Sequence, residues 1–473
     1  LPSAAVEGRL LIVENSRGMS NHTFLYQDTG AIGSDLLWDL RREFESDPRW
    51  RQSMNAVCHA PVSKVARSAR VFAATDFTFS HHLEENKATS QGASGRCWLF
   101  AALNTLRVVA IERMELEDDF EFSQNHLMFW DKMEKANYFL ESILLTLDEP
   151  TDGRLIAHLL SAPVQDGGQW HMFVNLVRKY GVVPKTAMPE TDSSGRTGEL
   201  NYQLTYLLRE AACRMRHAHH SGATEAEVRA MKAPALIEAY RMLAIHLGVP
   251  PRDFFWQWRD RDNKHHREGT MTPLRFYEKF VGADLGDMAC LIHCPQASKS
   301  FETLYTIRFL GNVVGGEPIK YLNVEVDVMK TAAANQIKAG EPVWFGCDVG
   351  KCLDRDSGLM DVDLFEYDLV YGRAPSMTKA ERLDYGHAQM THAMVFTGVD
   401  LDASDKPLKW RVENSWGDKA GDGGFMQMTD RWFDEHNYEV VVRKRYVPEA
   451  LLPVLDTEPI ALDPWDPMGA LAC

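Results

Sequence analysis

Apolar residues follow a helical spacing through roughly the first half of the chain. The segment 34–56 predicts two short helices, because Pro48 interrupts its pattern. The run 97–111 is apolar on nearly every face, which is typical of a buried central helix, and Ser94 is a candidate N-cap before it. Further helices are expected at 123–147, 169–180 and 201–247.

The pattern changes near residue 290, where short β-type runs replace the long helical periods. Clusters of Gly, Asp and Pro separate these runs, as is typical of strands joined by turns. The second half of the chain is therefore expected to form a largely antiparallel sheet or barrel. The tail 456–473 has several prolines and no periodicity, which predicts an extended arm. The expected strands are 321–326, 342–349, 392–399, 408–414, 424–428 and 438–445.

Composition and charge narrow the classes to which this protein can belong. Its 473 residues are 45% hydrophobic and 25% charged, which are globular proportions. No window approaches the ~20 apolar residues of a membrane span. The net charge of −16 argues against nucleic acid as a partner, because phosphate contacts need clustered Lys and Arg.

The eight cysteines are spread along a long chain without a secretory signal. We interpret them as mostly free thiols of a reducing, cytoplasmic compartment. Cys290 and Cys294, with His293 between them, resemble a metal clip, but a zinc site needs about four ligands and no second clip lies nearby. For the stretch 214–220 (RMRHAHH) we favour a polar helix face over a basic or metal-binding patch. We expect no metal and no cofactor.

Three residues far apart in the sequence form a candidate site for nucleophilic catalysis. Cys97 opens the buried helix, His392 opens a β-type run, and Asn414 ends another. A thiol is a good nucleophile only as the thiolate, and a helix N-terminus favours that anion. A neighbouring His can accept the thiol proton, and the side-chain oxygen of Asn can fix the imidazole. The pattern predicts a sulfur that is ionised near neutrality.

Acyl transfer also needs hydrogen-bond donors for the oxyanion. The candidate donors are the side-chain amide of Gln91, six residues before Cys97, and the Cys97 backbone N–H, which is unpaired in the first helical turn. Trp416, two residues after Asn414, is a candidate shield for the His–Asn hydrogen bond. A single buried Cys is usually a packing residue, so the joint presence of these groups carries the prediction.

The string QGASGRCW, from Gln91 to Trp98, resembles the active-site signature of the papain-like cysteine peptidases. ENSWG (413–417) resembles the segment that holds their Asn. Longer matches point to one branch, the bleomycin hydrolases and bacterial aminopeptidases C. The resemblance implies an α+β, papain-like fold with a helical lobe around the Cys helix and an antiparallel β-barrel lobe. The matching segments are 46–57, 95–100, 123–141, 166–185, 391–399, 411–417 and 464–472.

Two departures from secreted papain-like enzymes are informative. Those enzymes carry another Cys three residues before the nucleophile, in a disulfide, whereas Ser94 takes that place here and suits a reducing compartment. His392 and Asn414 follow Cys97 by about 300 residues, against roughly 130–150 in such enzymes, so an insertion is expected. The resemblance implies an added helical domain. The expected domains are an N-terminal helical segment (1–60), the helical lobe with the nucleophile (61–200), the inserted helical domain (201–290), the β lobe with His and Asn (291–455) and the C-terminal arm in the cleft (456–473).

The resemblance also implies an assembly and a specificity. Family members form homohexameric barrels whose active sites face an internal cavity. Their C-terminal arm lies in the active-site cleft, where its carboxylate meets the α-amino group of the substrate and makes them aminopeptidases. Ala472 and Cys473 would then bind substrate here, although the family's arm ends at or near that Ala. Gly167 and Gly168 match a substrate-binding stretch that pairs with an extended peptide, with an ordinary tight turn as the alternative.

The predicted function is that of a cytoplasmic cysteine aminopeptidase. It would hydrolyse N-terminal residues of peptides, and amide-type small molecules such as bleomycin, through a thioester. The alternatives are a nucleic-acid-binding regulator, since some family members bind DNA, and a catalytically silent scaffold of the same fold. The negative charge weighs against the first, and the complete set of four catalytic residues weighs against the second. Peptides and further copies of the chain are the expected partners, and no membrane is expected.

Overall fold

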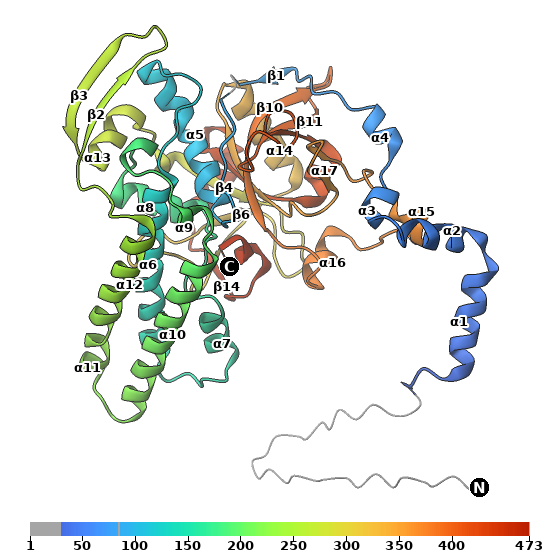
Figure 1. Cartoon of the computed structure of the whole chain (residues 1–473), viewed down its shortest axis with the longest axis horizontal. Coiled ribbons are helices and arrows are strands. Elements are labelled where there is room, and N and C mark those ends of the chain that lie inside the picture. The colour runs from blue at the N-terminus through green and yellow to red at the C-terminus, as the bar shows by residue number, and fades with distance from the viewer. Residues whose placement is uncertain (1–29, 84–85, 473) are drawn as a thin grey trace. The chain divides into compact units, whose positions relative to one another are not determined.

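A computed structural model describes residues 30–83 and 86–472 of the chain. The chain divides into two compact units (Figure 1). The described part of the smaller unit comprises residues 30–65 together with 369–372. The predicted catalytic residues all belong to the larger unit.

Short helices form the smaller unit. Pro48 occupies the first turn of its second helix, where the missing N–H is not needed, and the Asp47 side chain caps that helix by accepting a backbone N–H. The first two helices contain no buried residue. The prediction of two short helices interrupted at Pro48 is confirmed. The helices are α1 (Ser34–Ser46), α2 (Pro48–Val57) and α3 (Val62–Val65).

The helix that begins with the candidate nucleophile, α5 (Cys97–Met114), runs through the core of the larger unit. Its buried residues lie on every face, as the all-round apolar sequence predicts. Helices α6 (Gln124–Leu145) and α8 (Trp170–Tyr180) pack against α5, and α7 (Arg154–Ser161) packs against α6. The predicted helices at 97–111, 123–147 and 169–180 are therefore confirmed.

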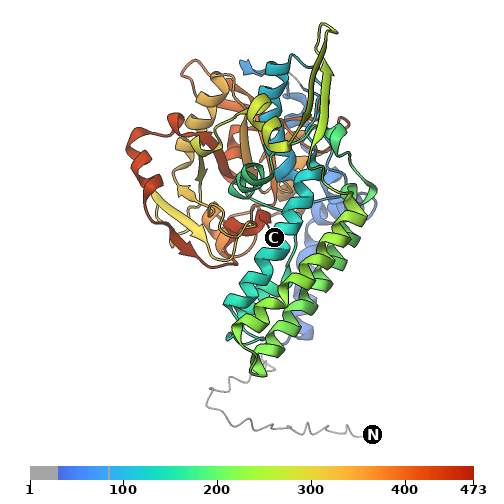
Figure 2. The same cartoon turned by 90° about the vertical axis from the view of Figure 1, so that its left-hand side faces the viewer.

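Two long helices, α10 (Gly198–His220) and α12 (Lys232–Leu247), lie along α6 (Figure 2) and are joined by α11 (Glu225–Ala230). The expectation that helix would continue to residue 290 is wrong. Strands β2 (Phe254–Arg259) and β3 (His265–Met271) instead form an antiparallel hairpin. Aromatic residues at alternate positions of β2 bury one face of that hairpin, which is a strand period and not a helical one.

A twelve-stranded sheet dominates the second half of the chain (Figure 1). Its strand order is β14-β5-β6-β4-β13-β7-β10-β11-β12-β9-β8, with β1 paired to β10. The six central strands from β4 to β12 all pair antiparallel, so the expected largely antiparallel sheet is confirmed. The strands are β1 (His81–His82), β4 (Met288–Ile292), β5 (Thr303–Ile307), β6 (Tyr321–Asn323), β7 (Val343–Cys347), β8 (Leu353–Asp354), β9 (Leu359–Met360), β10 (His392–Leu401), β11 (Pro407–Glu413), β12 (Phe425–Thr429), β13 (Asn437–Arg443) and β14 (Ile460–Leu462).

The sheet separates two hydrophobic cores. Side chains alternate across a strand, so Ala393 and Val395 of β10 belong to the core that contains α5. Met394 and Phe396 belong to the core on the opposite face. That face is covered by α14 (Val326–Lys338) and α17 (Asp430–His436). The short helices that complete the described fold are α4 (Ala69–Ala73), α9 (Asp192–Gly195), α13 (Pro273–Phe276), α15 (Tyr367–Tyr371) and α16 (Lys379–Asp384).

The C-terminal tail is more ordered than its sequence predicts. Strand β14 pairs parallel with β5, and a 3₁₀ turn, η7 (Pro467–Ala472), follows it. Met468 and Leu471 of this turn are buried in the core of α5. The prediction of an arm without folded elements is therefore wrong, because apolar contacts that the sequence pattern does not show hold it in place.

Candidate active site

Cys97 is the first residue of α5, and its side chain is 4% exposed. The N-cap is Arg96 and not the expected Ser94, whose hydroxyl instead donates to the Gln91 carbonyl at 2.6 Å. The Ala393 amide donates to the Cys97 sulfur at 3.4 Å. The thiol therefore lies where the start of a helix meets the residue that follows His392 on β10.

The structure brings His392 and Asn414 into direct contact. His392 is the first residue of β10, and Asn414 follows the last residue of β11, the strand paired with β10. The distance from His392 Nε2 to Asn414 Oδ1 is 2.9 Å. The Ser415 amide also donates to Oδ1, at 2.7 Å, which fixes this atom as the acceptor. His392 Nε2 then carries the proton, and Nδ1 remains for exchange with a thiol.

Two further contacts hold the Asn414 segment in place. The indole of Trp416 lies with its centroid 5.0 Å from the His392 ring, beside the hydrogen bond that the sequence predicts it to shield. Glu413, the residue before Asn414, forms a buried ion pair with Arg107 and accepts from Asn104 at 2.9 Å. Because both partners lie on α5, this pair ties the Asn segment to the helix that begins with the thiol.

Burial dominates the ionisation of the site. It raises the pKa of Cys97 to about 11, although the backbone amides of Ala393, Trp98 and Cys97 face the sulfur and act in the opposite direction. Burial also lowers the pKa of His392 to about 4. The sequence predicts a thiolate near neutrality, whereas burial of these two residues favours a neutral thiol and a neutral imidazole.

Gln91 is bound by the same segment that contains Asn414. Its backbone N–H donates to the Ser415 carbonyl at 2.9 Å, and its side-chain oxygen accepts from the Ser415 hydroxyl at 2.6 Å. One N–H of its side-chain amide donates to the Ser94 carbonyl. No motif in the sequence marks Ser415, although it directly follows the candidate Asn414.

The two predicted substrate-binding glycines make different contacts. Lys135 donates to the Gly167 carbonyl at 2.5 Å, so this group is occupied by the protein itself. Gly168 packs against Trp98, and an added Cβ would lie 2.5 Å from the indole ring. The Trp98 indole N–H donates to the Asp166 carbonyl at 2.7 Å. These contacts place the 166–168 turn directly beside the start of α5.

The C-terminal arm is anchored next to this turn. The Met468 carbonyl lies 3.3 Å from the Tyr321 hydroxyl and 3.5 Å from Gln169 Nε2, and Lys299 forms a 2.8 Å ion pair with Asp466. Ala472 ends the 3₁₀ turn, and Cys473 lies outside the described residues.

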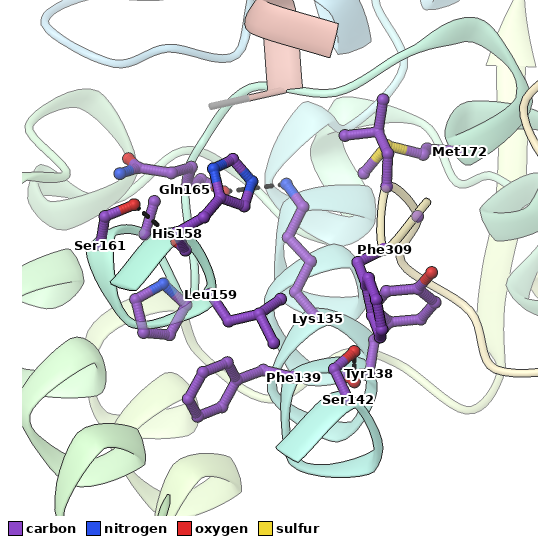
Figure 3. A pocket seen from close by; sticks show the side chains of 14 residues that line it. Lys135, Tyr138, Phe139, Ser142, His158, Leu159, Ser161, Gln165, Met172 and Phe309 are labelled. Atoms are coloured by element: carbon purple, nitrogen blue, oxygen red, sulfur yellow. Dashed lines mark hydrogen bonds between the residues drawn. The ribbon is translucent and has the colours of Figure 1, made fainter. Parts of the chain in front are cut away.

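A cavity of about 260 Å³ lies between α6, α7 and the loop 309–311, close to the arm (Figure 3). His158, which lines it, has its ring 6.2 Å from that of Trp465 in the arm. The Lys135 ammonium also lines the cavity, but Asp131, the Gln165 carbonyl and the Gly167 carbonyl already accept its hydrogen bonds. The cavity is therefore a mixed polar and apolar space without an unpaired Lys135 charge.

The candidate metal clip is accounted for by ordinary contacts. Cys294 Sγ lies 3.2 Å from Gln296 Oε1, and Cys290 Sγ lies 3.7 Å from His171 Nδ1. In the part of the chain that the structure describes, no three His, Cys, Asp or Glu side chains are grouped so as to hold a metal ion. The seven cysteines within that part are free thiols.

A thiol at the start of a buried helix, with an imidazole and an amide oxygen supplied by a neighbouring sheet, defines the class of papain-like cysteine peptidases. The model of the Peptidase C1-like family matches residues 31–469. The chain therefore belongs to the Peptidase C1-like family.

Curated relatives and a solved structure agree with this assignment. The chain is 47% identical to aminopeptidase C of Listeria monocytogenes, over 89% of this chain and 93% of that one. It is 42% identical to human bleomycin hydrolase, over 94% and 99%. The crystal structure of PepW from Lactobacillus rhamnosis superposes with a TM-score of 0.91 at 44% identity, and covers 93% of this chain and 99% of that chain. The predicted branch, α+β fold class and cysteine aminopeptidase class are confirmed.

Gly168→Ala should lower the free energy of unfolding by about 1–3 kcal/mol, because the new methyl group would overlap the rigid Trp98 ring. Gly195→Ala is the matched control, since a Cβ there would meet no atom within 4 Å. Urea unfolding of both variants measures the difference. Equal effects of the two substitutions would contradict the packing described here.

Proposed function

We propose that the enzyme removes N-terminal residues from peptides and that Cys97 is its nucleophile. The observation that carries this assignment is the 2.9 Å bond between His392 and Asn414, one residue from the amide that contacts the Cys97 sulfur. An imidazole oriented in this way, beside a thiol at a helix start, is suited to nucleophilic catalysis.

In the proposed reaction the Cys97 sulfur attacks the carbonyl carbon of the first peptide bond. The thiol proton passes to Nδ1 of His392, which makes the imidazole positively charged. The carbonyl oxygen becomes negatively charged as the sulfur bonds to carbon. His392 next donates this proton to the departing amine, which leaves a thioester on Cys97. Water attacks the thioester carbonyl and gives a proton to His392, the C–S bond breaks to release the N-terminal amino acid, and His392 returns the proton to the sulfur, which restores the free thiol. Asn414 acts by holding the imidazole through Nε2.

The oxyanion of this reaction would be stabilised by the Cys97 backbone N–H and the side-chain amide of Gln91. An amide NH₂ has two N–H groups, and the one that does not donate to Ser94 is assigned to the oxyanion. Ser415 supports this role, because it holds the oxygen of the same amide. A fixed donor in a dry site stabilises developing charge more than a mobile donor in water.

The 166–168 turn and the arm would bind the substrate. The Gly167 carbonyl is occupied by Lys135, so we assign backbone pairing with the peptide to Gly168. The arm runs beside this turn through its contact with Gln169, and its terminal carboxylate would pair with the α-amino group of the substrate. This pairing would select substrates by their free N-terminus. Ala472 and Cys473 are the residues assigned to that end.

Amide-type small molecules such as bleomycin are a second class of proposed substrate. The name of the human relative supports this class. A nucleic-acid-binding role and a silent scaffold are not favoured, since the relatives are named as hydrolytic enzymes and the catalytic side chains are present.

We further propose a cytoplasmic location and self-association as a homohexamer. Free thiols, seven of them among the described residues, suit a reducing compartment. Of the helices that the structure describes, none combines the length and the apolar character that crossing a bilayer requires. Helix α1 supports self-association, because it exposes Leu37, Leu40 and Phe44 on one face at helical spacing.

Cys97→Ala should abolish hydrolysis of an aminoacyl-arylamide, with a fall of more than ~10³-fold in kcat, because no other group supplies the attacking sulfur. Cys213→Ala, which removes an exposed thiol on α10, should retain wild-type activity. Steady-state kinetics of both variants check this. Substantial turnover by the Cys97→Ala variant would refute the assignment.

Deletion of residues 470–473 should lower kcat/KM for free-amine peptides by about 10–100-fold, because the charge-assisted hydrogen bond between the terminal carboxylate and the substrate α-amino group is lost. It should also permit cleavage of N-acetylated peptides, because the arm no longer blocks longer binding modes. Mass spectrometry of the products from matched free and acetylated peptides gives the cleavage sites. Unchanged sites would count against the proposed role of the arm.

Leu37→Asp combined with Leu40→Asp should reduce the oligomer mass, because two charges would be placed on the exposed face of α1. Tyr385→Asp, a substitution at another exposed apolar residue, should leave the mass unchanged. Light scattering gives the mass of each variant as a multiple of the 53.6 kDa chain. A monomeric wild-type protein would rule out the hexamer.

A further inference from the structure

The carboxylate of Asp166 accepts hydrogen bonds from four different groups. The Gly95 backbone N–H donates at 2.9 Å, Lys132 Nζ at 2.7 Å and Asn201 Nδ2 at 2.9 Å, and the Thr197 hydroxyl is the fourth donor. The Asp166 side chain is only 9% exposed, and that of Lys132 is fully buried. We refer to these five residues as the Asp166 cluster.

The Asp166 cluster joins segments that lie far apart in the sequence. Gly95 belongs to the loop before the nucleophile, Lys132 to α6, and Asp166 to the turn that contains the substrate-binding glycines. Thr197 is the N-cap residue of α10, and Asn201 lies in its first turn. One carboxylate therefore connects the long helix α10 to the loop that leads into Cys97.

Both sides of Cys97 are tied to residue 166. Gly95, two residues before the thiol, binds the Asp166 carboxylate, and Trp98, one residue after it, donates its indole N–H to the Asp166 carbonyl at 2.7 Å. The packing is also close, because a Cβ on Gly95 would lie 2.9 Å from that of Asp166. Movement of Asp166 would thus displace the sulfur and the substrate-binding turn together.

We propose that Asp166 is a positioning residue that, paired with Lys132, holds the nucleophile loop and the 166–168 turn in register and keeps their surroundings electrically neutral. This inference rests on the proposed function, since it presumes that Cys97 is the nucleophile.

The charges of the Asp166 cluster predict how substitutions in it should change the pKa of Cys97. The Asp166 carboxylate acts to raise the pKa of Cys97, and the Lys132 ammonium neutralises it. Burial alone would raise the pKa of Asp166, but Lys132 and the Gly95 amide hold it well below its usual range, so the carboxylate stays charged. The other charged or titratable groups packed around these residues include the Lys135–Asp131 pair on α6, the Arg96–Glu190 pair beside Cys97, His392 of β10 and Cys347 of β7.

Removal of the Asp166 charge and removal of the Lys132 charge should therefore shift the pKa of Cys97 in opposite directions. Asp166→Asn removes a negative charge and leaves Lys132 unpaired, so the thiolate should form at lower pH than in the wild type. Lys132→Met leaves the carboxylate unpaired, so the thiolate should form at higher pH. The expected displacement of the midpoint is about 0.5 pH or more in each case.

The experiment follows the rate of Cys97 alkylation by iodoacetamide against pH in the full-length protein, together with kcat/KM for an aminoacyl-arylamide. The Cys97 peptide is quantified by mass spectrometry, because Cys58 and Cys213 are exposed and also react. Asp166→Asn should lower kcat/KM by about 10–100-fold, since a small displacement of a reacting group has effects of this size.

Asp430→Asn is the matched control. Asp430 also accepts from a buried lysine, Lys330 at 2.7 Å, and from an indole, Trp410 at 3.2 Å, but it begins α17, which packs on the other face of the sheet. This variant should lose stability and keep the wild-type alkylation midpoint and kcat/KM. Thr197→Val removes one donor without a change of charge, so it should lower kcat/KM about 3–10-fold and leave the midpoint unmoved.

Opposite displacements of the midpoint in the Asp166→Asn and Lys132→Met variants, with none in the control, support the inference. Unmoved midpoints together with wild-type kcat/KM overturn it, and so does an equal displacement in Asp430→Asn. If Asp166→Asn does not fold, Lys132→Met and Thr197→Val decide by the same criteria. Failure of the proposed function is separate, because it shows as full activity in the Cys97→Ala variant.

Discussion

The active site depends on a contact between the start of a helix and the start of a strand. The Cys97 sulfur receives the Ala393 amide at 3.4 Å, and this contact places the thiol beside His392. Neither residue can move alone, because α5 is buried along its length and β10 is paired on both sides. Close-packed interiors have low compressibility and transmit strain, so the geometry at the thiol depends on the packing of the larger unit around it.

Buried polar groups link this contact to the rest of the site. The Arg107–Glu413 pair ties α5 to the Asn414 segment, Ser415 holds Gln91, and the Asp166 cluster holds the loop before Cys97. The buried charges of these contacts are paired, Arg107 with Glu413 and Lys132 with Asp166, as the low dielectric of an interior requires. The same burial raises the pKa of the thiol and lowers the pKa of the imidazole, so it favours the neutral form of each group before the reaction.

The smaller unit and the C-terminal arm differ in how they expose their apolar side chains, and we propose a different role for each. Helix α1 leaves its apolar face exposed, and exposed apolar patches are typical of surfaces that bind a partner. The arm instead buries Met468 and Leu471 against the core of the larger unit and runs beside the 166–168 turn. We thus propose that self-association and recognition of the substrate N-terminus belong to segments other than those that carry the candidate catalytic side chains.

The sequence by itself determined the main helices, the antiparallel sheet and the four catalytic candidates, because apolar periodicity and short motifs are local properties. It did not show the β2–β3 hairpin, the ordering of the arm, the Arg96 cap or the roles of Ser415 and Asp166. The hairpin was missed because short aromatic runs are ambiguous between helix and strand. The tertiary structure decided the rest, since an Asp between Gln165 and Gly167 has no recognisable pattern until Gly95, Lys132 and α10 converge on it.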